Sequence, residues 1–579
     1  MAGTCTRTSL AAFLLLAASP SGAAGTATAT GIPGLVVLGT ASAESLLEAF
    51  KTIYDTTQVN PPFELGTTAT VVRTTLPFVA IRSYVAPRDS SDKAGQTGGW
   101  IMPIAEMRGL TRAQILDRWA LPVYRDGTRN NRITLVVVPA GVSFWSGTAG
   151  PITNAVDGTG AWGQGGGIQY YVGWGAAGVR GYQVPLANYT VTGGADPGPV
   201  LVYGPRLTGG AKAVGAYLDG LPVSAYSDLD RALLTLDVLN LSNPADAAPL
   251  QAAVRQLSPE RYGALPYVLD HQRTLFLDAL GQHGDGQRAM VAPGLGVWAR
   301  AIGSSARFDS SDDVTGYRSA TWAGMAGADY RVNDALTLGI GGAYLTSRLD
   351  WHDAASSRGR IDTAMLGVHA TWTLSTVFLN GLLAGATSWG DVDRRIGVAD
   401  GGLLPGVSTA IDRAAKGKPT ANAVTARLDA GTTFMLDGVR VQPFAGLQYA
   451  HLDRRAFTES GADSLNLAVE RWSGHSLRAR LGVAASHDIG TAGPLAWSLD
   501  GRLLWSQRLS AASAGITAGL AGQPGSFAAP TAKESPWSLQ PALGLAAHFT
   551  GGHLYVRYEG DLRRGYGAHA GVAGAALAF

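Results

Sequence analysis

Few residues in the N-terminal third of this chain could do chemistry. Gly165, Gly166 and Gly167 form a run whose backbone amides could approach a ligand closely, because glycine has no side chain. No Lys-Ser or Lys-Thr pair follows the run, so it is not a phosphate-binding P-loop. The first histidine is His271 and the sole cysteine is Cys5, so no metal site is expected in this third.

The elements that would position the glycine run predict a compact α+β domain. Thr111 and Gln114 have capping-box spacing, which satisfies two backbone amides and starts a helix. Residues 133–138 are a continuous β-branched run, typical of a buried strand. The expected elements are helices over 43–54 and 112–119, strands over 70–75, 78–84 and 133–138, and a strand ending near 172.

The order of five short pieces carries a first family resemblance. The pieces are Arg82, Gly99-Trp-Ile101, Ala120-Leu-Pro122, Pro139-Ala-Gly141 and Gly165-Gly-Gly-Ile-Gln169-Tyr170. In this order they resemble the necrotizing-toxin family of NAD glycohydrolases and related toxin-like domains of large secreted bacterial proteins.

The resemblance implies a site that cleaves NAD as a substrate, with no bound cofactor. Gln169 would lie near the nicotinamide ribose, Arg82 would face the dinucleotide phosphates, and Gly165–Gly167 would bind the ligand. Arginine suits phosphate because its planar fork donates two hydrogen bonds. The acid–base histidine of that family is absent here. Two hypotheses stay open: a toxin-like NAD-cleaving enzyme, and a binding or adhesive domain for a host-surface ligand.

The C-terminal half alternates with period two up to its last residue. Leu554, Val556 and Tyr558 share one strand face, and the final strand ends on Phe579. Short turns alternate with long polar loops, as in transmembrane barrels. Twelve strands are expected to begin near residues 295, 317, 335, 361, 376, 421, 439, 476, 495, 537, 554 and 568. The prediction is a mainly β protein with a 12-stranded antiparallel transmembrane β-barrel, whose even strand count lets the last strand close on the first.

A second resemblance rests on three phrases in this half. Tyr558-Glu-Gly-Asp-Leu562, the apolar-x-Phe end at Phe579, and Gln256-Leu-Ser-Pro-Glu-Arg-Tyr262 resemble autotransporter translocator domains of type V secretion. The resemblance implies a Gram-negative outer-membrane protein with its passenger on the cell surface or secreted. Expected partners are outer-membrane lipid, periplasmic chaperones and the barrel-assembly machinery, and the chain is expected to be a monomer.

The segment before the barrel predicts a helix inside it. Residues 266–284 at about 1.5 Å each give a helix of about 28 Å, close to the roughly 25 Å apolar band of such barrels. On a lumen wall, Asp270, Arg273 and Asp278 would find polar partners, whereas lipid would make them costly. Inward-facing strand arginines are expected to pair with the helix carboxylates: Arg427, Arg440, Arg478, Arg480 and Arg502. The alternative is an amphipathic helix packed on the passenger.

The whole chain divides into four predicted parts. These are a signal peptide over 1–24, a passenger over 25–210, a helical connector over 211–290 and the barrel over 291–579. After the N-terminus, no run of about 20 apolar residues predicts a helical membrane span. The net charge of +2 gives no support for nucleic acid as a partner.

Overall fold

The protein is described from a computed structural model, in which two compact units can be recognised. The structure describes residues 28–29, 32, 34–85, 99–173, 180–182, 198–242, 245–286, 294–311, 314–353, 356–402, 404, 406–511, 515–531 and 535–579. The N-terminal unit comprises residues up to 255 together with 397–412, and the barrel unit comprises 256–396 and 413–579. The predicted signal peptide, with Cys5, lies outside the described residues.

The N-terminal unit is built on two antiparallel sheets. The larger sheet has the order β1 (Thr28–Ala29), β2 (Leu35–Ser42), β3 (Thr68–Thr74), β7 (Ser143–Thr148), β8 (Ile168–Tyr171), β5 (Trp100–Ile101). The smaller has the order β4 (Phe78–Tyr84), β6 (Arg132–Val138), β9 (Arg180–Tyr182). Val136 and Val138 on β6 share one apolar core with the larger sheet, and Leu135 and Val137 belong to a second core. Burial on both faces explains the continuous apolar run of β6.

Helices cover this pair of sheets. Leu46 and Phe50 of α2 (Ala43–Ile53) share a core with Val71 and Trp145 of the larger sheet. The second core of β6 takes side chains from α4 (Arg112–Arg118) and α6 (Asp228–Ser242). The predicted capping box is confirmed, since the Gln114 amide donates to the Thr111 hydroxyl and the Gln114 side chain accepts from the Thr111 amide.

The segment assigned to the connector from residue 211 onward begins with helices of the N-terminal unit. These are α5 (Gly209–Asp219), α6 and α7 (Ala248–Arg255). Arg108 holds α6 in place, with its Nη1 2.5 Å from Asp230 and its Nη2 2.6 Å from Asp237. Burial raises the pKa of the Asp237 carboxyl above its usual value, although Arg108 and the Tyr203 hydroxyl oppose the shift. This buried network makes α6 part of the domain core.

A loop from the far half of the sequence completes that core. Residues 397–412 connect β14 (Val377–Val398) to β15 (Ile411–Gly417). Leu404 is buried in the same cluster as Val238 of α6. The Thr235 hydroxyl donates to the Thr409 carbonyl.

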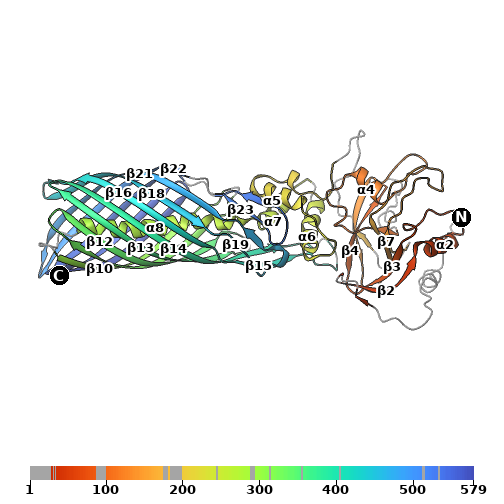
Figure 1. Ribbon diagram of the computed structural model, residues 1–579, viewed down its shortest axis with the longest axis horizontal. Helices are drawn as coiled ribbons and strands as arrows, with labels where there is room; N and C mark the ends of the chain where they lie inside the picture. The colour runs from red at the N-terminus through yellow and green to blue at the C-terminus, as the bar shows by residue number, and fades with distance from the viewer. Residues whose placement is uncertain are drawn as a thin grey trace. The chain divides into compact units, whose positions relative to one another are not determined.

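The barrel unit contains the predicted closed barrel of twelve long antiparallel strands (Figure 1). They are β10 (Gly294–Phe308), β11 (Tyr317–Arg331), β12 (Leu336–Trp351), β13 (Arg358–Leu374), β14, β16 (Thr420–Thr432), β18 (Val439–Arg454), β21 (Trp472–Ala492), β22 (Leu495–Ala511), β25 (Trp537–Phe549), β26 (Gly552–Arg563) and β27 (Tyr566–Ala578). The last strand pairs with the first from Gly296 opposite Ala578 to Phe308 opposite Tyr566, which leaves no free edge. Two short strands, β15 and β17 (Phe434–Leu436), extend the sheet.

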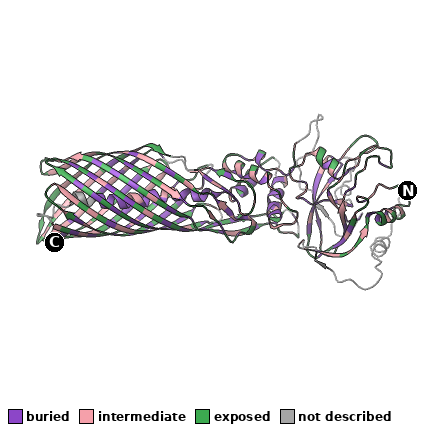
Figure 2. Cartoon of the chain, in the orientation of Figure 1, coloured by how far each residue is buried: buried purple, intermediate pink, exposed green. Residues whose placement is uncertain are grey.

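Residues of the barrel strands alternate between the lumen and the outer surface, as Figure 2 shows. On β26, Leu554, Val556 and Tyr558 are exposed on the outside, as their spacing predicts. One helix of the barrel unit, α8 (Leu265–Gly286), runs inside the barrel (Figure 1). Among the described residues, no helix has both the length and the apolar character that crossing a membrane would require.

Candidate functional site

The apolar side of α8 is fitted closely to one part of the barrel wall. Phe276 and Leu280 are fully buried in a cluster with Trp298, Ile302 and Met365. Glycines on the wall make room for them, because a Cβ atom at Gly367 would lie 2.7 Å from Leu280 Cδ1. A Cβ atom at Gly341 would lie 2.8 Å from the other methyl carbon of the same leucine. The helix therefore fills this side of the lumen at van der Waals contact.

The opposite side of α8 carries a carboxylate that several wall arginines bind. Asp278 Oδ1 accepts a hydrogen bond from Arg427 Nη1 at 2.8 Å, and Oδ2 accepts one from Arg502 Nη2 at 2.6 Å. Arg480 Nη2 lies 3.9 Å from Oδ1, and Asp429 balances part of the positive charge by binding Arg427 Nε at 3.1 Å. Buried ion pairs of this kind fix the position of the helix against the wall more than they raise the free energy of unfolding.

A second carboxylate binds the wall nearer the start of the helix. Asp270 pairs with Arg478 at 3.4 Å and with Arg563 at 3.1 Å, and also with Arg273 of the helix itself. Gln272 between these carboxylates donates to Ser347 Oγ at 2.8 Å and accepts from Thr363 Oγ1 at 2.6 Å. These two hydrogen bonds hold the Gln272 side-chain amide against the neighbouring strands β12 and β13.

The lumen location predicted for this helix is confirmed, and so is its pairing with four strand arginines. Arg427, Arg480 and Arg502 bind Asp278, and Arg478 binds Asp270. Arg440, at the start of β18, lies in register opposite Ser486, and its pairing with the helix stays a prediction. The arrangement holds a helix in one rotation and one depth inside a closed barrel.

In the N-terminal unit, the two predicted catalytic side chains each donate to a backbone carbonyl. Arg82 on β4 donates from Nη1 to the Trp100 carbonyl at 2.7 Å. Gln169 on β8 donates from Nε2 to the Pro62 carbonyl at 2.7 Å. The Arg82 side chain thus contacts strand β5 and the Gln169 side chain contacts a loop of the same domain. Their role in cleaving NAD stays a prediction.

The glycine run predicted to bind a ligand is packed against backbone. The amides of Gly165, Gly166 and Gly167 donate to the carbonyls of Asp117, Ala149 and Arg118 at 2.9, 2.7 and 2.9 Å. A Cβ atom at Gly165 would lie 2.3 Å from the Ala149 oxygen, so the close approach itself requires glycine. Ligand binding by these glycines stays a prediction. The described residues include no group of three or more His, Cys, Asp or Glu side chains that could hold a metal ion.

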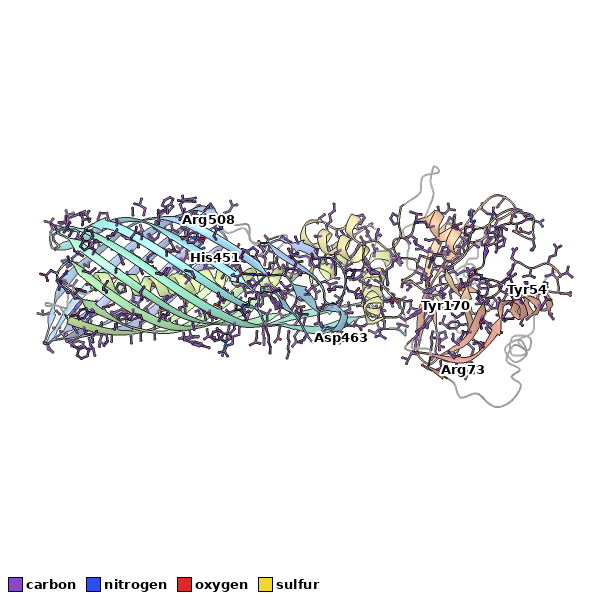
Figure 3. The ribbon with its side chains drawn as sticks, viewed as in Figure 1. Tyr54, Arg73, Tyr170, His451, Asp463 and Arg508 are labelled. Atoms are coloured by element: carbon purple, nitrogen blue, oxygen red, sulfur yellow. The ribbon has the colours of Figure 1, made fainter. Side chains whose placement is uncertain are left out.

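An aromatic cluster that the sequence did not predict extends from a core of the N-terminal unit to the surface at Tyr54. Tyr171 packs between Phe50 and Trp100, with ring centroids 4.8 and 4.9 Å away. Its hydroxyl lies 3.2 Å from that of Tyr54, which is 44% exposed just after α2 (Figure 3). These rings come from three separate segments, so no local pattern could have predicted the cluster.

Comparison with known proteins gives one family match, over the barrel. The family described as "Autotransporter beta-domain" matches residues 297–559. An extracellular serine protease of Serratia marcescens is 25% identical over 270 residues, which are 45% of this chain and 24% of that protein. Outer membrane protein A of Rickettsia conorii is 25% identical over 201 residues, 34% of this chain and 10% of its own length. The chain thus spans about a quarter or less of the curated relatives it matches.

Two solved structures similar to this chain are the translocator domain of one autotransporter and the β-domain of another. That of NalP from Neisseria meningitidis is 16% identical, covers 56% of this chain and 100% of its own, and has a TM-score of 0.45. The β-domain of the Bordetella protein BrkA is 16% identical, covers 49% of this chain and 100% of its own, and has a TM-score of 0.35.

Proposed function

We propose that this chain, whose residues 297–559 are an autotransporter β-domain, exports its own N-terminal unit and anchors it at the cell surface. The barrel lies in the outer membrane. The observation that carries the proposal is the helix α8 inside a closed barrel, held there by Asp270 and Asp278. If the N-terminal unit has passed through the barrel, the segment that follows it should remain in the lumen as a helix. That helix would anchor the exported unit and fill the pore.

This proposal includes the partners of export. Periplasmic chaperones keep the chain unfolded, the barrel-assembly machinery inserts the monomer, and outer-membrane lipid surrounds it. The test is expression of the full chain in a Gram-negative host. We expect a heat-modifiable outer-membrane band and an N-terminal unit that added protease removes from intact cells. An N-terminal unit protected from protease until the cells are lysed would overturn export.

For the displayed domain we propose a binding role, with a host-surface ligand. It is supported by the exposed Tyr54, which packs on Phe50 and lies beside Tyr171, since aromatic rings with a polar tip are enriched where proteins meet partners. The matched variants are Tyr54→Ala, expected to weaken attachment of cells to a host-cell layer, and Val156→Ala at another exposed apolar position, expected to leave it unchanged. Equal attachment by all three strains would contradict the binding role.

The second candidate is cleavage of NAD, which rests on the resemblance around Gln169. Arg82 Nη1, Gln169 Nε2 and the amides of the glycine run donate to carbonyls of the domain, and this favours binding over catalysis. Cells displaying the full chain would be incubated with NAD, and free nicotinamide would be measured. Release that is lost in Gln169→Ala would establish the enzyme and displace the binding proposal.

A further inference from the structure

The turn just before the lumen helix is buried although it is rich in polar side chains. Residues Pro259–Ala264 form the 3-10 turn η2, which runs directly into α8. Glu260, Arg261 and Tyr262 are 4%, 2% and 0% exposed. Glutamate and arginine are almost never fully buried unless they are paired, so each must have a partner.

Each of the three side chains binds a different loop at the same end of the barrel. Glu260 accepts from Thr315 Oγ1 at 2.6 Å, in the loop between β10 and β11. Arg261 donates to Asp353 Oδ2 at 2.8 Å, between β12 and β13. The Tyr262 hydroxyl donates to Glu459 Oε1 at 2.7 Å, between β18 and β21.

The next residue of the turn, Gly263, faces a further loop. A Cβ atom there would lie 3.3 Å from Thr531 Cγ2 and 3.6 Å from Ile516 Cδ1, between β22 and β25. This loop and the one between β18 and β21 form a small sheet of their own, in the order β19 (Phe457–Thr458), β20 (Leu467–Val469), β23 (Ile516–Leu520), β24 (Phe527–Ala529). Four consecutive residues of one turn therefore touch four loops.

Glu459 is the centre of these contacts. Arg394 binds it through two nitrogens, with Nε 2.9 Å from Oε1 and Nη2 2.6 Å from Oε2, and both side chains are fully buried. The Leu467 amide donates to Oε2 at 2.8 Å. Arg394 Nη1 also donates to the Gln256 carbonyl at 2.8 Å, just upstream of the turn. The carboxylate thus ties a barrel strand and a loop to the segment that enters the lumen.

We propose that Pro259–Ala264 is a latch, by which the loops stop the exported chain at one register and hold it there. This inference rests on the proposed export function and adds a second fixation point to the carboxylates of α8. Glu260, Arg261 and Tyr262 can contact their three loops together only when the chain has formed the turn. A chain that is still unfolded and moving through the pore has not formed it. Tyr262 can join the buried contact between Glu459 and Arg394 only when the whole turn has reached the mouth of the barrel.

The test uses a single cysteine in the full chain expressed in the outer membrane, with Cys5 also replaced. Ala264→Cys lies in the latch at a position 5% exposed, and Thr458→Cys is an exposed reference on β19. With the latch intact, a membrane-impermeant maleimide should label position 264 on intact cells at least about tenfold more slowly than position 458. Adding Tyr262→Phe and Glu459→Gln, which removes the hydroxyl and the charge, should raise labelling at 264 about tenfold.

A matched control comes from an exposed arginine of the loop between β18 and β21. Arg471 pairs with Asp453 at 2.8 Å but is 70% exposed, so Arg471→Met should leave labelling at 264 unchanged. Surface protease treatment of the N-terminal unit and the heat-modifiable gel shift report export and barrel folding separately. The latch is overturned if position 264 labels as fast as 458 in the intact protein. It is equally overturned if the double variant exports its N-terminal unit and position 264 stays protected.

Discussion

The carboxylate of Asp278, on the helix inside the barrel, lies 2.8 Å from the Arg427 guanidinium on the wall, and both side chains are about 4% exposed. Because both charges are buried, the polar groups around them must replace their solvation. The same carboxylate binds Arg502 through its second oxygen, so one residue of the helix joins two strands far apart in the sequence. The position of the helix is therefore coupled to both strands.

Asp278→Asn should loosen the helix in the lumen. It leaves Arg427 and Arg502 buried without their carboxylate, and breaking a buried pair in this way costs about 3–5 kcal/mol. We expect the heat-modifiable band to convert at a lower temperature and single-barrel conductance in planar bilayers to rise. Asp350→Asn is the control, because its pair with Arg358 is about 70% exposed and should matter little. Unchanged conductance and conversion temperature would contradict the coupling.

Gly367→Leu should displace the helix from the wall. The new side chain would occupy the space of Leu280 and Phe276, and an overpacked site costs about 1–3 kcal/mol or more. We expect a folded barrel with higher conductance. Gly385→Leu on the next strand provides the comparison, because a Cβ atom at this exposed position meets nothing within 4 Å. Equal conductance of the two variants would show that the close fit at Gly367 is unimportant.

Leu404→Ala should destabilise the N-terminal unit although the mutation lies between two barrel strands. A buried leucine truncated to alanine costs about 2–5 kcal/mol, and this one packs with the core around Val238. Urea-dependent proteolysis of the displayed unit should shift to lower urea, while the gel shift of the barrel stays the same. Ser408→Ala, at an exposed position of the same loop, should change neither.

The latch should open in acid. Burial raises the pKa of the Glu459 carboxyl, but Arg394 and hydrogen bonds from Tyr262 and Leu467 outweigh it and hold the pKa below its ordinary value of 4.5. Its stabilising contribution is therefore complete above pH 4.5 and is lost as pH falls through the lower folded value. Hydrogen exchange at the Leu467 amide, corrected for the intrinsic rate, should stay slow down to that pH and accelerate below it. Glu459→Gln should remove this pH dependence.

The barrel could be predicted strand by strand because its signals are local. Period-two alternation and short turns placed strands near residues 317, 439, 495 and 537, and β11, β18, β22 and β25 begin at those residues. The helix expected over 266–284 is α8, which spans 265–286. The strand and helix predictions both follow from the spacing of apolar and polar residues along the chain. In the strands, this spacing separates the side chains that face the lumen from those that face lipid.

The latch and the aromatic cluster could not be predicted, because their partners are distant in sequence. Glu459 meets Arg394 and Tyr262 only after three segments have folded together. The alternation of β14 around Arg394 does not indicate which partner this side chain meets. The available hint was the phrase Gln256–Tyr262, in which the adjacent polar residues Glu260 and Arg261 precede the helix. For Asp278, the kind of partner was predictable, namely an inward arginine, but the choice among the arginines follows from strand register.

Because of loop 397–412, the N-terminal unit and the barrel cannot be exchanged between proteins as separate sequence segments. Leu404 belongs to the hydrophobic core of the N-terminal unit, yet it is encoded within the barrel sequence. A chimera that moves residues 1–255 to a foreign barrel would leave that side chain behind. A domain boundary drawn at one position in the gene would therefore divide a folding unit that the chain assembles from two places.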